Sequence, residues 1–263
     1  MRPEIVKIKK DINNEIKISP GMDFLSRIQR ILRPIKLKFR KYYGKVIGYK
    51  DFHFVNNILM PFMYSTKDEL NFLDIGAAQG DMTLAFIERF PNFNNVICFE
   101  PNPNQFKTLS KRLAKFKNVE KVNIGLGSES KELEMDICTS YGDASSFLGT
   151  TKTVKNMGYL SSKENVKIEK LDNYLSKHKF EKIHFLKMDV EGYELEVLRG
   201  AVNTLENVEN IYIEICHLYH PKLSRHIIDV FDFLNNQGFC YIGCYGDYFF
   251  TKNEKLIDHF FND

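Results

Sequence analysis

The feature that most constrains this 263-residue chain is an apolar run ending in an acid and a glycine turn, followed by a second apolar run ending in another acid. In the first run Asp74 precedes the turn Gly76-Ala77-Ala78-Gln79-Gly80, and the second run, Val96–Phe99, ends at Glu100. A strand, a glycine turn, a helix and a second strand make up a βαβ unit, and such units hold nucleosides at the ends of their strands. We therefore expect a nucleoside-binding α/β domain.

The turn also limits which nucleoside cofactor fits. Glycine lets the backbone approach a ligand closely, and an acid in the position of Glu100 can accept both ribose hydroxyls. The spacing from Gly76 to Gly80 lacks the third glycine of a dinucleotide fingerprint, so it offers no site for a pyrophosphate. The sequence favours S-adenosylmethionine, which has no phosphates. The alternative is a tight turn that binds nothing.

The composition is that of a soluble globular protein. Hydrophobic residues make up 43% and charged residues 27%, and the net charge of +3 is too small to indicate nucleic acid as a partner. The five cysteines are an odd number, which argues against a disulfide framework. With no N-terminal apolar segment and no apolar stretch of membrane-spanning length, these features predict a cytoplasmic protein.

We expect two parts: a basic, helical N-terminal extension, residues 1–68, and a Rossmann-like domain, residues 69–263. Within the extension, residues 23–43 interleave arginines and lysines with apolar side chains, at helical spacing as far as Pro34. A basic amphipathic segment of this kind covers one end of a domain, contacts a second copy of the chain, lies on the inner face of a membrane, or binds substrate phosphates. These readings stay open.

From Phe72 onward, strand and helix patterns alternate, as in a parallel sheet with helices on both faces. Strands are expected at 71–75, 95–100, 119–126, 183–189 and 209–216, and helices at 80–90, 103–116, 193–206 and 223–236. Two short strands, 132–137 and 166–169, flank a polar loop, residues 139–163, that we expect to contact substrate. Residues 238–251 predict a final antiparallel hairpin turning near Gly246.

Acids and histidines follow the fourth and fifth predicted strands. Asp189 and Glu191 follow one, and Glu214 and His217 end the other, with His220 just beyond. The carboxyl ends of parallel strands meet at one edge, so these groups should gather near Asp74 and Glu100. Clustered acids bind cations, pair with donors or share protons, and the sulfonium of S-adenosylmethionine is a cation.

Two of these acids have second readings. Glu191 precedes a helix, and its alternative role is to cap that helix, because acids favour helix N-termini. Glu214 interrupts an apolar strand, and Lys187 is its expected partner if it is buried.

Five motifs in order resemble the FkbM-type family of S-adenosylmethionine-dependent methyltransferases over residues 71 to about 220. They are Leu73-Asp74-Ile75-Gly76-Ala77 with Gly80 and Thr83; Phe99-Glu100-Pro101-Asn102-Pro103; Ser145-Ser146; Leu171-Asp172; and Leu186-Lys187-Met188-Asp189-Val190-Glu191-Gly192-Tyr193-Glu194 with Leu198, Gly200 and Ala201. The resemblance implies a Rossmann-like class I methyltransferase sheet of seven strands, one of them antiparallel. It also implies methyl transfer to oxygen, commonly a sugar hydroxyl of a glycan, glycolipid or polyketide.

The residue assignments combine the strand-end argument with this resemblance. The cofactor-binding candidates are Asp74, Gly76, Ala77, Gly80, Thr83, Glu100, Pro101, Asn102, Leu126 and Asp189, and the catalytic candidates are Asp189, His217, Glu191 and Glu214. A metal-free base, His217 or Asp189, is favoured over Mg²⁺ held by Asp189 with Glu214 or His217, because no adjacent acid pair follows the fifth strand.

The expected acceptor is a sugar hydroxyl of a nucleotide-activated sugar or a surface-polysaccharide precursor, such as a capsular polysaccharide. A lipid or polyketide-type acceptor, and a non-catalytic scaffold with a vestigial cofactor fold, are the alternatives. Nucleic acid is not expected, because no pocket motif for a flipped base is present.

Overall fold

The computed structural model describes residues 55, 59–138, 147, 161–178, 180–215, 225–245 and 247–261. Most of the predicted extension 1–68, including the basic segment 23–43, lies outside these residues. Its four possible roles therefore stay predictions.

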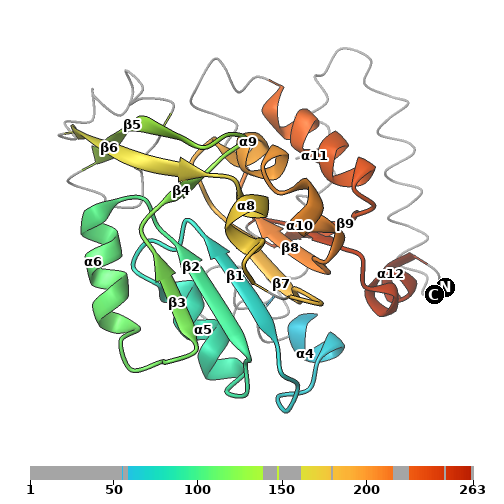
Figure 1. Cartoon of the computed structure of the whole chain (residues 1–263). Helices are drawn as coiled ribbons and strands as arrows, with labels where there is room; N and C mark the ends of the chain where they lie inside the picture. Colours follow the sequence, from blue (N-terminus) through green and yellow to red (C-terminus); the bar gives the residue numbers. More distant parts are fainter. Residues whose placement is uncertain are drawn as a thin grey trace.

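A seven-stranded sheet forms the centre of the domain, in the order β3-β2-β1-β7-β8-β10-β9 (Figure 1). Its strands are β1 (Asn71–Ile75), β2 (Asn95–Phe99), β3 (Val119–Val122), β7 (Phe185–Met188), β8 (Asn210–Ile213), β9 (Cys240–Tyr245) and β10 (Asp247–Thr251). Strand β10 runs antiparallel to both neighbours, and the other pairs are parallel. This confirms the predicted Rossmann-like sheet with one antiparallel strand.

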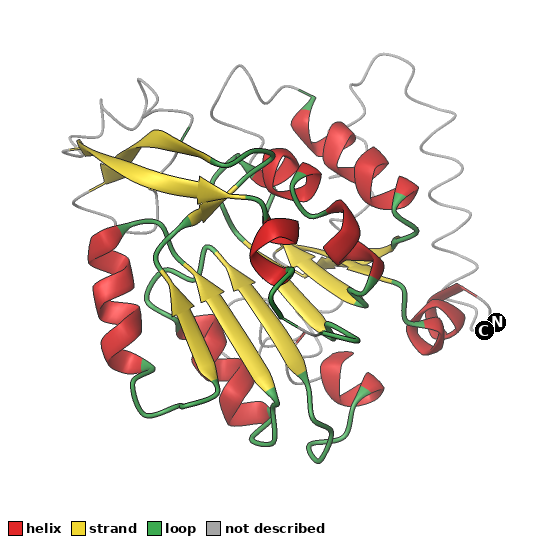
Figure 2. Ribbon diagram, viewed as in Figure 1, coloured by secondary structure: helices red, strands yellow, loops and turns green. Residues whose placement is uncertain are grey.

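Helices cover both faces of the sheet (Figure 2). Neighbouring strand residues point to opposite faces, so Leu73 packs in one core and Phe72 in the other. The Leu73 side is covered by α8 (Leu171–Leu175), α9 (Glu194–Arg199), α10 (Val202–Glu206) and α11 (His226–Asn236). The Phe72 side is covered by α4 (Met60–Met63), α5 (Asp81–Arg89), α6 (Pro103–Arg112) and α12 (Glu254–Phe261). None of the described helices combines the length and apolar character needed to cross a bilayer.

A second sheet, ordered β4-β6-β5, lies beyond the carboxyl ends of β1, β2 and β3 (Figure 1). It consists of β4 (Gly125–Leu126), β5 (Lys131–Cys138) and β6 (Ser161–Glu169). The prediction of one strand over 119–126 was therefore wrong. The side chain of Asn123 donates hydrogen bonds to the carbonyls of Glu100 (2.8 Å) and Pro101 (3.1 Å), and after Asn123 the chain leaves the main sheet for the second.

The second sheet also shortens the predicted loop 139–163. Strand β6 begins at Ser161, which pairs with Cys138. Across the same pair of strands, Lys163 forms an ion pair with Glu134 that supports the longer hairpin. The residues before Ser161 remain the candidate substrate loop, and of these the structure describes Phe147.

The predicted helix 193–206 is two helices. A Cβ on Gly200 would lie 1.9 Å from the carbonyl oxygen of Gly127, so the chain after α9 is pressed against the second sheet's connection. Helix α10 then starts anew, and Asp172 accepts hydrogen bonds from the amides of Asn203 (3.0 Å) and Thr204 (2.8 Å) at its start. Two short helices, α8 and α12, were not predicted.

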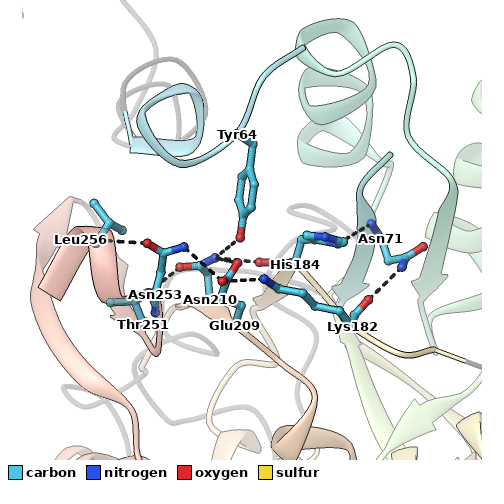
Figure 3. A network of polar contacts seen from close by, with 9 residues as sticks. All are labelled: Tyr64, Asn71, Lys182, His184, Glu209, Asn210, Thr251, Asn253 and Leu256. Atoms are coloured by element: carbon cyan, nitrogen blue, oxygen red, sulfur yellow. Dashed lines mark hydrogen bonds and ion pairs between the residues drawn. The ribbon is translucent and has the colours of Figure 1, made fainter. Parts of the chain in front are cut away.

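A polar network lies at the amino ends of β1 and β8, which is the end of the main sheet away from the second sheet (Figure 3). Asn210 donates to the Tyr64 hydroxyl (2.9 Å) and the His184 carbonyl (2.8 Å), and accepts from Thr251 (2.6 Å). His184 accepts the amide N–H of Asn71 at 3.1 Å, and burial lowers the pKa of its ring to about 4. His184 therefore lies neutral at the edge away from the strand ends that face the second sheet.

Candidate active site

The strand order reverses between β1 and β7, because the chain goes from β1 to β2 on one side and β7 pairs with β1 on the other. In open α/β sheets, ligands bind at the carboxyl ends of the strands at such a reversal. Four predicted site residues lie at this edge, following β1, β2, β7 and β8 in turn: Gly76, Glu100, Asp189 and Glu214.

The turn after β1 is shaped by Gly76, whose φ is +73°. A Cβ at this position would lie 1.8 Å from the carbonyl oxygen of Asp189, so only glycine fits. The amides of Gly76 and Ala77 both donate to the carbonyl of Phe99, at 2.9 and 3.0 Å. These two N–H groups are used within the protein, in agreement with a cofactor that needs no pyrophosphate cradle.

Gly80 has a different reason to be glycine. Its φ is +84°, it occupies the N-cap position of α5, and its amide donates to the Ala77 carbonyl at 2.8 Å. A Cβ here would lie 2.7 Å from a methyl carbon of Leu109, on α6. Backbone conformation and the packing of α5 against α6 therefore explain this glycine, and its contact with a cofactor stays a prediction.

Glu100 is held between the turns that follow β1 and β2. Its carboxylate is nearly buried, with Oε2 accepting the Ala78 amide (2.7 Å) and Oε1 accepting the Asn102 amide (2.8 Å). Burial raises the pKa of Glu100 to about 7, against the lowering effect of the two N–H donors. Each oxygen has a second lone pair, so the carboxylate can still accept hydroxyls.

Asp74 lies completely buried beneath the turn. Its Oδ2 accepts the hydroxyl of Thr83 at 2.5 Å. Its Oδ1 receives no hydrogen bond from the described residues, and the nearest cation is Lys187 Nζ at 3.5 Å. Asp74 and Thr83, both predicted as cofactor-binding, support the turn from behind, and their direct contact with cofactor stays a prediction.

Lys187, in β7, links the two ends of the site. Its ammonium donates to the carbonyl of Gly76 at 2.6 Å and lies 3.7 Å from Asp189 Oδ2. Burial acts to lower the pKa of Lys187, but the charges of Asp74 and Asp189 outweigh it and raise the pKa. Lys187 therefore stays charged and pairs with Asp74 and Asp189 rather than with Glu214, the partner that the sequence suggested.

The chain turns sharply after Asp189. The Asp189 amide donates to the Ile75 carbonyl at 3.0 Å, and its carboxylate is 30% exposed. Glu191 and Gly192 then adopt φ values of +50° and +97°. The N-cap residue of α9 is Tyr193, so Glu191 does not occupy the capping position that was its alternative reading. A non-glycine residue with positive φ stores strain that often marks a functional turn.

Glu214 follows β8, and its amide donates to the Met188 carbonyl at 2.9 Å. The side chain as a whole is exposed, yet desolvation of its carboxyl and the like charges of Asp189 and Asp247 raise the pKa to about 7. His217 and His220 lie outside the described residues, so their roles stay predictions. Within the described ranges, no three His, Cys, Asp or Glu side chains form a group that could hold a metal ion.

A comparison with known protein families identifies the family of this chain. Residues 74–241 match the family model "Methyltransferase FkbM domain". The chain belongs to the FkbM methyltransferase family. Its fold is also that of the FkbM methyltransferase from Methylobacillus flagellatus KT, with a TM-score of 0.53 and 16% identity, over 94% of this chain and 60% of that one.

Two curated relatives of this chain carry names that mention a substrate or a position. The hexuronic acid methyltransferase AglP of Haloferax volcanii is 30% identical over 129 residues, 49% of this chain and 50% of that protein. The 2-O-methyltransferase NoeI of Sinorhizobium fredii is 26% identical over 171 residues, 60% of this chain and 69% of that protein. The matched part of the chain thus spans only half the length of the AglP protein.

The other predicted cofactor residues have framework roles in the structure. Asn102 is the N-cap of α6, with Oδ1 accepting the amides of Asn104 (3.0 Å) and Gln105 (3.4 Å). Leu126 lies in β4 and is buried in the core. Pro101 separates Glu100 from the cap. Direct contact of these residues with a cofactor stays a prediction.

Three residues near this candidate site were missed by the sequence analysis. Glu194 and His226 form a buried pair behind Asp189, and Asp247, from the hairpin, contributes to the raised pKa of Glu214. Glu194 is the last residue of the motif that begins at Leu186, so the sequence did contain a signal for it. His226 is a single histidine at the start of a helix and gave no signal.

Proposed function

We propose that this chain transfers a methyl group from S-adenosylmethionine to a sugar hydroxyl. The observation that carries the proposal is the carboxylate of Glu100, fixed by two backbone amides at the end of β2 beside a glycine turn, in a chain of the FkbM methyltransferase family. The sugar is suggested by the name of the hexuronic acid methyltransferase AglP, and transfer to oxygen by that of the 2-O-methyltransferase NoeI.

The residues present fit S-adenosylmethionine. Glu100 offers acceptor positions for ribose hydroxyls, and the amides after β1 already have partners, as a ligand without phosphates allows. Behind the turn, the two carboxylates of Asp74 and Asp189 face one ammonium, that of Lys187. The excess negative charge favours a cationic ligand. When bound, S-adenosylmethionine supplies an electrophilic methyl group on positively charged sulfur.

A sugar hydroxyl is a weak nucleophile at neutral pH, so a base should accept its proton as the new bond forms. Glu214 suits that role because its pKa of about 7 lies near the working pH and its side chain is exposed at the strand ends. Asp189 and His217 are the alternatives. This proposal uses no metal, and full activity in the presence of a chelator would support it, whereas activity restored only by Mg²⁺ would contradict it.

The acceptor we propose is a nucleotide-activated sugar or surface-polysaccharide precursor, methylated in the cytoplasm before export. The second sheet lies over the carboxyl ends of β1 to β3, where it can complete an acceptor pocket (Figure 1). The basic segment 23–43 would then bind substrate phosphates, the membrane surface or a second copy of the chain. Charge-removing changes at Arg27, Arg30 and Arg33 test this: a raised KM for the acceptor at constant cofactor affinity indicates phosphate binding.

The cofactor half of the proposal is tested by isothermal titration with S-adenosylmethionine. A one-to-one complex that is weakened in Glu100→Ala supports it. If titration of S-adenosylmethionine into the wild-type protein gives no heat of binding, a non-catalytic scaffold is supported instead.

A further inference from the structure

A buried carboxylate–imidazole pair, Glu194 with His226, lies against the turn that carries Asp189. Glu194, the first residue of α9, is fully buried, and His226, the first residue of α11, is nearly so. His226 Nε2 bonds to Glu194 Oε2, while Glu194 Oε1 accepts the amide of Gly192 at 2.8 Å. One carboxylate thus joins a turn and the starts of two helices, which lie side by side (Figure 1).

The turn needs such support because of its conformation. Glu191 and Gly192 are consecutive residues with positive φ, and for Glu191 this conformation is unfavourable. On the β1 side the turn is fixed by the bond from the Asp189 amide to Ile75 and by the close approach of Gly76. On the far side, the bond from Gly192 to Glu194 fixes it, and His226 fixes Glu194 in turn.

A purely structural purpose explains this pair poorly. A buried carboxylate and a buried imidazole both lose their hydration, so apolar residues of similar volume often give equal or greater stability. The carboxylate of Glu194 also lies near enough to Glu214 to contribute to the raised pKa of that candidate base. The pair therefore lies against the turn that carries Asp189 and near Glu214.

We propose that Glu194 and His226 are a positioning pair, which holds the Asp189–Gly192 turn to the start of α11 and so aims the carboxylate of Asp189 at the reacting groups. The pair touches neither cofactor nor acceptor. The inference rests on the proposed function for its effect on turnover, but its effect on the turn can be measured without any acceptor.

The test combines hydrogen–deuterium exchange over residues 189–194 with steady-state kinetics on the full chain. His226→Ala should raise the exchange rate at the Gly192 amide by about tenfold or more, because its acceptor loses its anchor on another element. It should lower kcat by about tenfold to a hundredfold, since small misplacements of reacting groups have effects of this size. The affinity for S-adenosylmethionine, measured by titration, should change much less than kcat.

Two further variants make the test specific. His226→Gln keeps a hydrogen-bond donor and should restore most of the protection and of kcat. Arg225→Ala is the matched control, because Arg225 precedes His226 and, among the described residues, its side chain forms an exposed ion pair with Asp229. It should leave exchange and kcat unchanged.

Unchanged exchange at Gly192 in folded His226→Ala overturns the proposal, as does a fall in kcat that only follows the folded fraction. If His226→Ala does not fold, Glu194→Gln replaces it, and the same rise in exchange and fall in kcat are required. A wild-type protein that methylates no sugar contradicts the proposed function alone, because the exchange measurement still decides whether the pair holds the turn.

Discussion

Gly76 and Asp189 come from neighbouring strands, and a Cβ on Gly76 would lie only 1.8 Å from the carbonyl oxygen of Asp189. The turn that faces the proposed cofactor and the turn that carries the proposed acidic centre therefore touch through their backbones. Lys187 adds a second link, from the Gly76 carbonyl to the Asp189 carboxylate. A change in the conformation of either turn should therefore displace the other.

Gly76→Ala should disrupt this contact. Gly238→Ala is the matched control, because Gly238 has a similar φ of +82° while its Cβ would come no nearer than 3.8 Å to Lys252. Both variants bear the strain of a left-handed alanine, about 1–2 kcal/mol. The clash should cost Gly76→Ala a further 1–3 kcal/mol or so, measured by urea unfolding. Equal unfolding free energies for the two variants would contradict the contact.

Glu100→Ala should weaken S-adenosylmethionine binding by about 1–3 kcal/mol, because ribose hydroxyls lose a buried acceptor. The ligand bonds to the ionised carboxylate, whereas the pKa of Glu100 in the free protein is about 7. Below that pH a proton must leave before binding, so affinity should rise between pH 6 and pH 8 and then level off.

Titration calorimetry at several pH values checks this prediction. The pH dependence should disappear in Glu100→Ala and persist in Glu88→Ala, which changes an exposed acid of α5. Wild-type affinity that falls as the pH rises through 7 would show that Glu100 does not bind in its ionised form.

Glu214→Gln tests the proposed base. In the wild-type protein the rate should increase with pH through about 7, as Glu214 loses its proton and becomes able to accept one. The variant should lose this rise and lower kcat by about 10²–10⁴-fold. A pH–rate profile that is retained in Glu214→Gln but lost in His217→Gln would move the role of base to His217.

Lys187→Met should strongly destabilise the fold, because Asp74 and Asp189 would lose the ammonium between them. Removing one partner of a buried ion pair costs about 3–5 kcal/mol. Lys107→Met, on the exposed side of α6, is the control. Adding Asp74→Asn to Lys187→Met should recover part of the loss in thermal unfolding, and no recovery would argue that Lys187 acts mainly on Asp189.

Much of the fold could be predicted because the central parallel strands are mostly apolar and their ends carry glycine turns or acids. Asp74, Gly76, Glu100 and Asp189 were placed by this pattern alone. The break between β3 and β4 could not be predicted, because it depends on hydrogen bonds from the Asn123 side chain to carbonyls that follow a different strand. The split of helix 193–206 likewise depends on the contact of Gly200 with Gly127.

The partners of site residues were harder to predict than their positions. Lys187 was expected to pair with Glu214, but in the sheet it lies directly beside Asp74 of β1. Its ammonium therefore reaches Asp74 and the carbonyl of Gly76. The pairing of Glu194 with His226 joins residues far apart in sequence, and no local pattern indicates it.

The most direct test of the central claim is a mass-spectrometric assay with S-adenosylmethionine carrying a deuterated methyl group. The acceptors are nucleotide-activated sugars, hexuronic acids among them, and Asp189→Asn is the control. The account predicts that one sugar gains a single labelled methyl group on an oxygen, with turnover strongly reduced in Asp189→Asn although the variant stays folded. Label found on nitrogen or carbon, or on no sugar although the cofactor binds, would contradict it.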